Sequence, residues 1–163
     1  MSSSVLAGVR GDDSDPTVLR AAAELCRRVG LPLVVGHVVA VPGNLPAGCE
    51  AVAQLGTDIE LDLVVTTSAL LDPCPVPWSL AITAGDAYAG LRSLAEQHDA
   101  AVIVIGTHGS GPRNALRRLV HGSVSARLIH QQTRPVLVVP ISPERSPRAR
   151  RAVAKPSDAT GPE

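Results

Sequence analysis

Residues 101–111, which read AVIVIGTHGSG, indicate the fold of this chain more clearly than any other stretch. The segment 101–105 is entirely apolar and rich in β-branched residues, which is typical of a strand buried on both faces of a sheet. A glycine-rich loop from Gly106 to Gly111 follows directly, and glycines let a backbone approach a ligand closely. A buried strand that leads into such a loop predicts an α/β fold with a binding site beyond the strand's carboxyl end.

The same kind of strand occurs twice near the start of the chain, on either side of a predicted helix. Residues 5–9 and 33–39 are short apolar runs. Between them, Asp15 is predicted to cap a helix, Pro16 to occupy its first position and Gly30 to end it. Strand, helix and strand in this order form a βαβ unit, which implies parallel strands and a right-handed crossover.

The rest of the chain supplies further strands and helices. The predicted strands are residues 79–83 and 136–139; the predicted helices run from Ala87, capped by Asp86, to about His98, and from Gly122 to about His130. Five strands with helices between most of them predict a doubly wound α/β sandwich built on a five-stranded parallel sheet.

Two stretches carry weaker signals. Residues 47–55 are consistent with a short helix, whereas residues 59–71 fit either a strand or an amphipathic segment. The proline-rich segment 72–77 is expected to be extended, because each proline disfavours helix in the residue before it. Residues 142–163 are rich in Pro, Arg, Ser and Ala and have no apolar period, so we expect one domain over residues 1–141 followed by a disordered basic tail.

Composition and charge exclude several classes of function. The chain has 163 residues, 45% of them hydrophobic, which is enough for one domain with a substantial core. Phenylalanine is absent, and Trp78 and Tyr88 are the only large aromatic residues, whereas readers of RNA or single-stranded DNA need rings for base stacking. Fifteen basic and fifteen acidic side chains cancel. We therefore expect neither a nucleic-acid partner nor a membrane partner.

Hydropathy and cysteine spacing add two expectations. No apolar run approaches the roughly 20 residues that cross a bilayer, and the polar start of the chain is no signal peptide, so a soluble cytoplasmic protein is expected. Cys26, Cys49 and Cys74 are widely spaced and odd in number, which predicts neither a disulfide framework nor a zinc site. Cys26 falls on the core face of a predicted helix and is interpreted as a small buried hydrophobic residue.

Glycines and hydroxyls in the second half of the chain form a candidate phosphate site. Gly106 and Gly109 leave the carboxyl end of a strand, and Gly122-Ser123 opens a helix whose free N–H groups attract anions. The hydroxyls of Ser123 and Ser125 are placed to donate to the same phosphate oxygens. The alternative is that the glycines only form the turn and Ser123 only caps the helix; spacing alone does not decide between the two.

Several of these segments together resemble a universal stress protein domain over roughly residues 4–141. The segments that carry the resemblance are residues 5–9, 37–39, Gly85-Asp86, and most specifically 104–109, 122–125 and 134–139. The resemblance implies strand order 3-2-1-4-5 and a homodimer formed through the last strand, Val136 to Val139. It also implies ATP or AMP, with or without Mg²⁺, bound at the switch point between strands 1 and 4.

The resemblance further implies which residues line the nucleotide site, with no catalytic residue and no metal ligand among them. They are Gly8, Val9, Arg10, Val38, Ile105, Gly106, His108, Gly109, Gly122, Ser123, Val124 and Ser125. His108 is expected to form a hydrogen bond to the ligand or to lie on the surface. His37, at the end of a strand, is interpreted as a structural residue.

The loop between the glycines departs from the nucleotide-binding pattern of that family, which is Gly-x2-Gly-x9-Gly-Ser/Thr. Twelve residues rather than nine separate Gly109 from Gly122, and residues 112–114 look like the insertion. The longer loop is expected either to shift the phosphate site or to add Arg113 as a phosphate ligand.

Arg10 is the second departure. It stands where ATP-binding members of the family usually have an aspartate that faces adenine and ribose. A guanidinium can only donate hydrogen bonds, whereas a carboxylate accepts them. Either the charge of Arg10 favours additional phosphate in the ligand, or its side chain folds back onto Asp12 or Asp13 and blocks the site.

Two functions of different classes follow. The first is a cytoplasmic stress-response or signalling module that binds ATP or AMP, hydrolyses it slowly at most, and acts on a signalling partner that the sequence does not identify. The alternative is a nucleotide-independent dimeric interaction module of the same fold. A small ATPase or flavin-binding enzyme is disfavoured, because the sequence lacks a Walker lysine and rings that would enclose a flavin.

Overall fold

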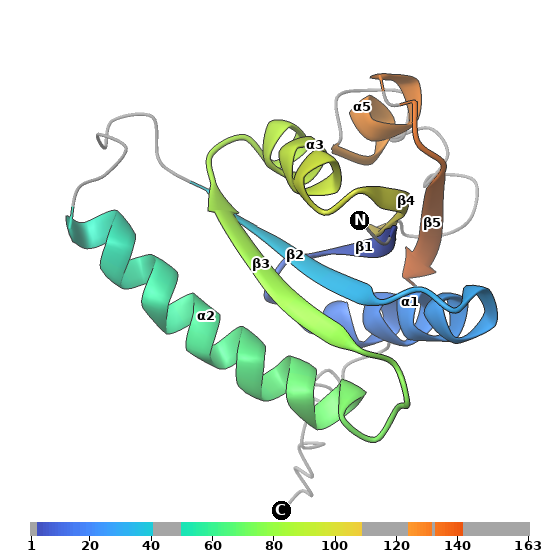
Figure 1. The fold of residues 1–163 in the computed structure, drawn as a ribbon. Helices are drawn as coiled ribbons and strands as arrows, with labels where there is room; N and C mark the ends of the chain where they lie inside the picture. The colour runs from blue at the N-terminus through green and yellow to red at the C-terminus, as the bar shows by residue number, and fades with distance from the viewer. Residues whose placement is uncertain (1–2, 41–49, 109–123, 132, 142–163) are drawn as a thin grey trace, which may run out of the picture.

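Strands and helices alternate along the chain in the computed structural model, which describes residues 3–40, 50–108, 124–131 and 133–141 (Figure 1). In chain order the elements are β1 (Ser4–Val9), α1 (Asp15–Val29), β2 (Leu33–Val39), α2 (Glu50–Leu71), β3 (Trp78–Ala84), α3 (Ala87–Gln97), β4 (Ala100–His108), α5 (Val124–Gln131) and β5 (Val136–Ile141). All strand pairs are parallel, and the strand order is β3-β2-β1-β4-β5. The predicted doubly wound α/β sheet and its order are therefore confirmed.

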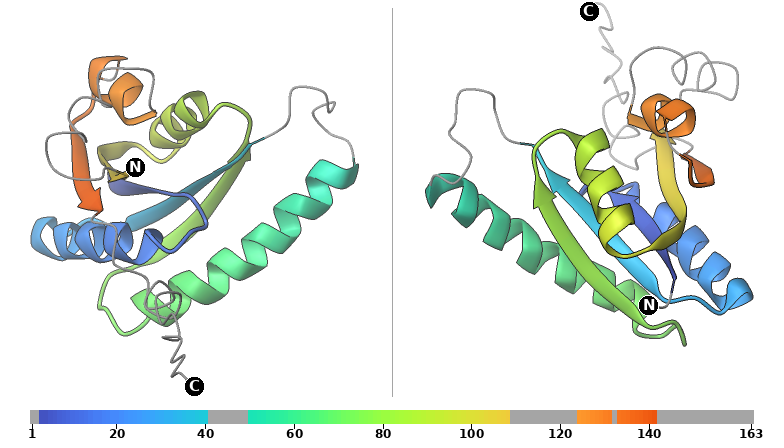
Figure 2. Two further views of the ribbon diagram at one scale, coloured as in Figure 1. Left: turned by 180° about the vertical axis from the view of Figure 1, so that it is seen from behind. Right: turned by 45° about the horizontal axis from the view of Figure 1, so that its top comes forward.

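Helices cover both faces of this sheet, with α1 and α2 on one side and α3 and α5 on the other (Figure 2). Side chains along β1 alternate between the two layers: Val5, Ala7 and Val9 join the core under α1 and α2, and Leu6 joins the core under α3 and α5. Because both faces of the central strands are covered, these strands appear in the sequence as continuous apolar runs.

The predicted cap of α3 and the predicted end of α1 are confirmed, whereas α1 begins one residue earlier than predicted, so that Pro16 is its second residue. The carboxylate of Asp86 caps α3 by accepting from the N–H of Ala89 at 3.0 Å, and Gly30 ends α1. The prediction that Asp15 caps α1 is wrong, because Ser14 holds the cap position and Asp15 is the first helical residue. The Asp15 carboxylate serves the preceding loop instead, as described below.

α2 is one continuous helix, so the strand alternative for residues 59–71 is wrong, and these residues continue the helix that was predicted only as a short one. The alternation of Leu61, Leu63 and Val65 suggested a strand, but Leu63 is buried whereas Leu61 and Val65 are exposed. Burial recurs at Thr67 and Leu71, which gives the four-residue spacing of one helix face. This buried face places α2 beside α1 and β3.

The segment that joins α2 to β3 turns rather than running extended throughout. The N–H of Cys74 donates to the carbonyl of Leu71, and the N–H of Val76 donates to the carbonyl of Cys74, both at 2.8 Å. Prolines disfavour helix in the preceding residue, but they are compatible with turns.

β4 is longer than predicted, because residues 106–108 continue the strand instead of starting the glycine loop. They pair with residues 139–141 of β5. β5 accordingly extends through Pro140, and an edge strand tolerates a proline because no further strand pairs on its outer side. The carboxyl end of β4, next to the candidate site, is therefore His108 rather than Ile105.

The interpretation of Cys26 as a small buried residue is confirmed. Its side chain is 1% exposed, and burial raises the pKa of its thiol to about 11. Across the described parts of the chain, none of the helices is both long and apolar enough to traverse a bilayer. Cys49 and the predicted tail, residues 142–163, lie outside the described residues.

Candidate functional site

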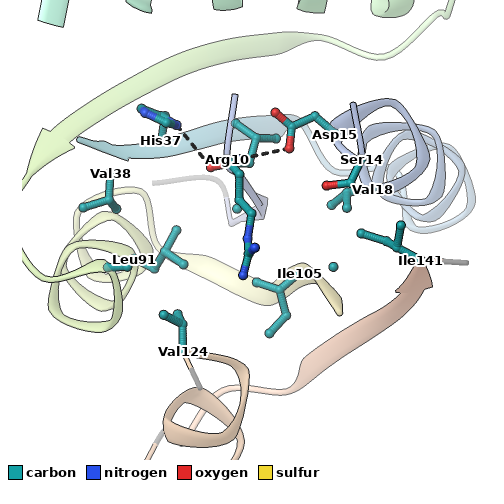
Figure 3. A pocket seen from close by; sticks show the side chains of 14 residues that line it. Arg10, Ser14, Asp15, Val18, His37, Val38, Leu91, Ile105, Val124 and Ile141 are labelled. Carbon is teal, nitrogen blue, oxygen red and sulfur yellow. Dashed lines mark hydrogen bonds between the residues drawn. The ribbon is translucent and has the colours of Figure 1, made fainter. Parts of the chain in front are cut away.

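A cavity lies over the carboxyl ends of β1, β2 and β4, where the strand order reverses (Figure 3). Its volume is about 150 Å³, and it is partly open to solvent. The residues that line it are Gly8, Val9, Arg10, Ser14, Asp15, Val18, His37, Val38, Ala87, Leu91, Ile105, Gly106, Val124 and Ile141. In open α/β sheets this is the position at which ligands bind.

The cavity brings together many of the residues that the sequence placed at the nucleotide site. Those that line it are Gly8, Val9, Arg10, Val38, Ile105, Gly106 and Val124. His108 is the last residue of β4 and Ser125 is the second residue of α5. The other members of the predicted set, Gly109, Gly122 and Ser123, lie outside the described residues.

The loop between β1 and α1 is built around the carboxylate of Asp15. This carboxylate is buried and accepts from the backbone N–H groups of Arg10 at 2.8 Å, Gly11 at 2.6 Å and Asp12 at 3.1 Å. Gly11 adopts a φ of 78°, which few other residues adopt without strain, and so allows the three N–H groups to converge. Ser14 closes the other side of the loop, donating from its backbone N–H to Asp12 at 2.9 Å and also from its hydroxyl.

Arg10 sits on this loop, and its side chain runs from the end of β1 into the cavity toward Ile105 (Figure 3). The side chain therefore does not fold back over the loop, which was one of the two predicted possibilities. Within the described residues, the ion pairs lie on α1, on α3 and between α3 and α5, and none of them includes Arg10.

His37 supports the same loop from β2. Its Nδ1 lies 3.2 Å from the carbonyl oxygen of Val9, and because a carbonyl only accepts, Nδ1 is the donor. The ring is 6% exposed and lines the cavity near Gly11. His37 is thus a structural residue, as interpreted from the sequence, and also part of the cavity wall.

The opposite wall is held by contacts between α3 and α5. Arg127 donates to both carboxylate oxygens of Asp86 at 3.2 and 3.1 Å, and its guanidinium lies 4.3 Å from the centre of the Tyr88 ring. The Ala89 N–H, together with Arg127, holds the pKa of Asp86 below its usual value. These contacts fix the start of α5, and thus Val124, relative to the α3 side of the cavity.

Sequence reasoning did not place seven of the lining residues at this site, and it missed the supporting contact of Arg127; the seven are Ser14, Asp15, Val18, His37, Ala87, Leu91 and Ile141. Asp15 carried a signal, because a carboxylate close behind a buried strand can satisfy loop N–H groups, but that signal was assigned to the helix cap. Arg127 carried none, because its partner Asp86 lies 41 residues earlier in the chain.

The described side chains form a binding cavity with apolar walls and a polar rim. Both oxygens of Asp15 accept from backbone amides, and His37 donates to a backbone carbonyl. A cluster of at least three acidic, histidine or cysteine side chains able to hold a metal does not occur among the described residues.

A five-stranded parallel sheet in the order 3-2-1-4-5, with a cavity at its switch point, defines a Rossmann-like α/β domain. The model of the universal stress protein family matches residues 1–140, and the chain belongs to that family. No curated protein matches the sequence.

Solved structures of the family share this fold. A universal stress protein from Archaeoglobus fulgidus is 22% identical, with a TM-score of 0.66 over 85% of this chain and 99% of its own. The universal stress protein from Archaeoglobus fulgidus in complex with dAMP is also 22% identical, with a TM-score of 0.60 over 84% of this chain and 97% of its own. A universal stress protein in complex with cAMP is 18% identical, with a TM-score of 0.65 over 85% of this chain and 97% of its own. At these identities the likeness shows the fold alone.

Proposed function

We propose that this universal stress protein binds an adenine nucleotide, ATP or AMP, in the cavity at the β1–β4 switch point. The observation that carries the proposal is the cavity itself, which combines apolar walls with the guanidinium of Arg10. Nucleotides have both an apolar base and anionic phosphates, so such a cavity complements both ends of the ligand. The complexes of related proteins with dAMP and cAMP support the ligand class.

In this proposal the protein is a cytoplasmic stress-response module that signals its nucleotide state to a partner, with slow hydrolysis at most. Val38 and Leu91 provide the apolar surface against which an adenine ring packs, whereas the Arg10 side chain runs toward Ile105 on the phosphate side of the cavity. A phosphate lies toward Gly106 and Val124, where a strand ends and α5 begins. Mg²⁺, where present, binds with the phosphates.

ATP or AMP is expected to raise the melting temperature of the purified protein. A ligand at 100 times its dissociation constant stabilises the folded state by about 2.7 kcal/mol, which corresponds to about 5–10 °C for a chain of this size. Differential scanning fluorimetry with and without Mg²⁺ measures the shift, and inorganic triphosphate at equal ionic strength is the matched control. No shift at millimolar ATP or AMP would contradict the proposal and favour the nucleotide-independent interaction module.

We also propose that the protein is a homodimer formed through β5. β5 is an edge strand, so its outer backbone groups are available for pairing with a second copy. Its Leu137 is 41% exposed, whereas Val136 and Val138 pack against the core under α3 and α5. Leu137 is therefore the side chain on β5 that tests the interface with least effect on the fold.

Leu137→Lys is expected to convert the dimer into a monomer, because the substitution places a charge in each half of an apolar interface. Sedimentation velocity measures the change in mass. Val65→Lys on α2, at the opposite edge of the sheet, is the matched control and is expected to stay dimeric. A dimer that survives Leu137→Lys but not Val65→Lys would place the interface on α2.

A further inference from the structure

The only charged side chains that line the cavity are those of Arg10 and Asp15, as far as the described residues show, and they differ in what they contact. The Asp15 carboxylate is 5% exposed and already accepts from the N–H groups of residues 10, 11 and 12. The Arg10 side chain extends into the cavity toward Ile105, and the residue is exposed to solvent. The positive charge in the cavity is therefore not paired with the cavity's own carboxylate.

An arginine in this setting favours an anionic ligand. Its guanidinium stays protonated at any physiological pH and presents several N–H groups in a plane, which match the oxygens of a phosphate. Charge-assisted hydrogen bonds are roughly twice as strong as neutral ones. Arg10 is exposed to solvent, so a ligand without a phosphate leaves no buried unpaired charge, but it gains no ion pair with the guanidinium.

Asp15 determines where Arg10 lies. Its two carboxylate oxygens hold three consecutive N–H groups, so the backbone from Arg10 to Asp12 has little freedom. Asp12 accepts from Ser14 on the other side of the loop, whereas Asp15 is the side chain that holds the N–H groups of Arg10 and Gly11. The position of the Arg10 side chain therefore depends on a residue that contacts only the backbone of the loop.

We propose that Arg10 determines the ligand class of this cavity, selecting phosphorylated adenine nucleotides over adenosine, and that Asp15 is the positioning residue that holds Arg10 in the cavity. The inference rests on the proposed adenine-nucleotide function and deepens it. In this inference Arg10, directly after β1, recognises phosphate instead of accepting hydrogen bonds from ribose hydroxyls.

The first test compares the affinities of AMP, cAMP and ATP with that of adenosine by isothermal titration calorimetry. The wild-type protein is expected to bind the phosphorylated ligands at least tenfold more tightly than adenosine. In Arg10→Gln the ratio of adenosine to AMP dissociation constants is expected to fall about tenfold, the equivalent of one charge-assisted hydrogen bond. Arg10→Lys keeps the charge but loses the planar fork, so it is expected to retain an intermediate ratio. A ratio that is unchanged in Arg10→Gln would overturn the role of Arg10.

The second test examines Asp15 with and without ligand. In Asp15→Asn, the amides of residues 10–12 are expected to exchange with solvent at least tenfold faster in an NMR experiment, because an acceptor oxygen is replaced by a donor. Asp15→Asn is also expected to lower the preference for AMP over adenosine. In the Arg10→Gln background, adding Asp15→Asn is expected to lower this preference no further, because Asp15 acts through Arg10. Faster exchange with an unchanged preference, or an equal loss in both backgrounds, would overturn the positioning role.

The two levels of the proposal fail in different ways. Adenosine binding as tightly as AMP in the wild-type protein would overturn the selection by Arg10 and leave adenine binding intact. Absence of binding by every adenine ligand would overturn the proposed function and the selection with it. In that case the exchange rates of residues 10–12 still decide whether Asp15 holds the loop.

Discussion

Leu128→Ala is expected to lower the free energy of unfolding by about 2–5 kcal/mol, the usual cost of removing a large aliphatic side chain from a packed core. Leu128 is the residue of α5 that is 0% exposed, and it belongs to the core shared by α3, β1 and β4. α5 is a short helix, so most of its stability has to come from this contact rather than from helix propensity. Urea unfolding followed by circular dichroism measures the change.

Ile129→Ala is the matched control, because Ile129 is the next residue of the same helix, has a side chain of similar size and is 41% exposed. Its replacement is expected to change the unfolding free energy by no more than about 0.5 kcal/mol. The Leu128 variant is also expected to weaken nucleotide binding, because Val124 at the start of α5 lines the cavity. Equal destabilisation by the two variants would contradict the described orientation of α5.

The sheet could be predicted from the sequence because its central strands are buried on both faces. Residues 101–105 are apolar without interruption and residues 33–39 are apolar apart from His37, which is typical of strands between two helical layers. The strand order is not encoded in any single strand. It was predicted from the resemblance to a family, and the pairing of β1 with both β2 and β4 confirms it.

α2 could not be predicted with the same certainty, because its exposed face also carries large apolar side chains. Leu61 and Val65 are 69% and 62% exposed, whereas Leu63 is 5% exposed. A helix is recognised by a period of about 3.6 between apolar and polar positions, and apolar residues on both faces remove that period. Only the packing of Leu63 and Leu71 against the core shows which face is inside.

The candidate site was predicted in part for a related reason. Residues that end or follow strands, such as Arg10 and Gly106, were found because the fold brings carboxyl ends together. Asp15 and Arg127 were not found, because their roles depend on tertiary contacts. Asp15 lies in a typical capping sequence but binds the loop before the helix, and Arg127 acts across a gap of 41 residues.

Gly90→Val is expected to destabilise the protein by about 1–3 kcal/mol, although valine is not a worse helix former than glycine. Gly90 lies where α3 packs tightly against β2 and β3. A Cβ atom there would lie 2.8 and 2.9 Å from the two Cγ atoms of Val38 and 3.0 Å from Cγ2 of Thr83. Both neighbours are β-branched, so their methyl groups cannot rotate away without leaving a preferred rotamer.

Gly90→Val is also expected to weaken ligand binding. To accommodate the larger side chain, α3 has to move away from β2, and Val38, Ala87 and Leu91 on these two elements all line the cavity. Ala89→Val is the matched control, since it places the same side chain on the exposed position beside Gly90, and it is expected to change stability by less than about 0.5 kcal/mol. Adding Val38→Ala to Gly90→Val removes the two closest methyl groups, so the double variant is expected to be at least about 1 kcal/mol more stable than the sum of the single effects. Strictly additive effects in urea unfolding would mean that α3 relaxes away from Val38 without cost, and that the close approach at Gly90 does not fix the cavity wall.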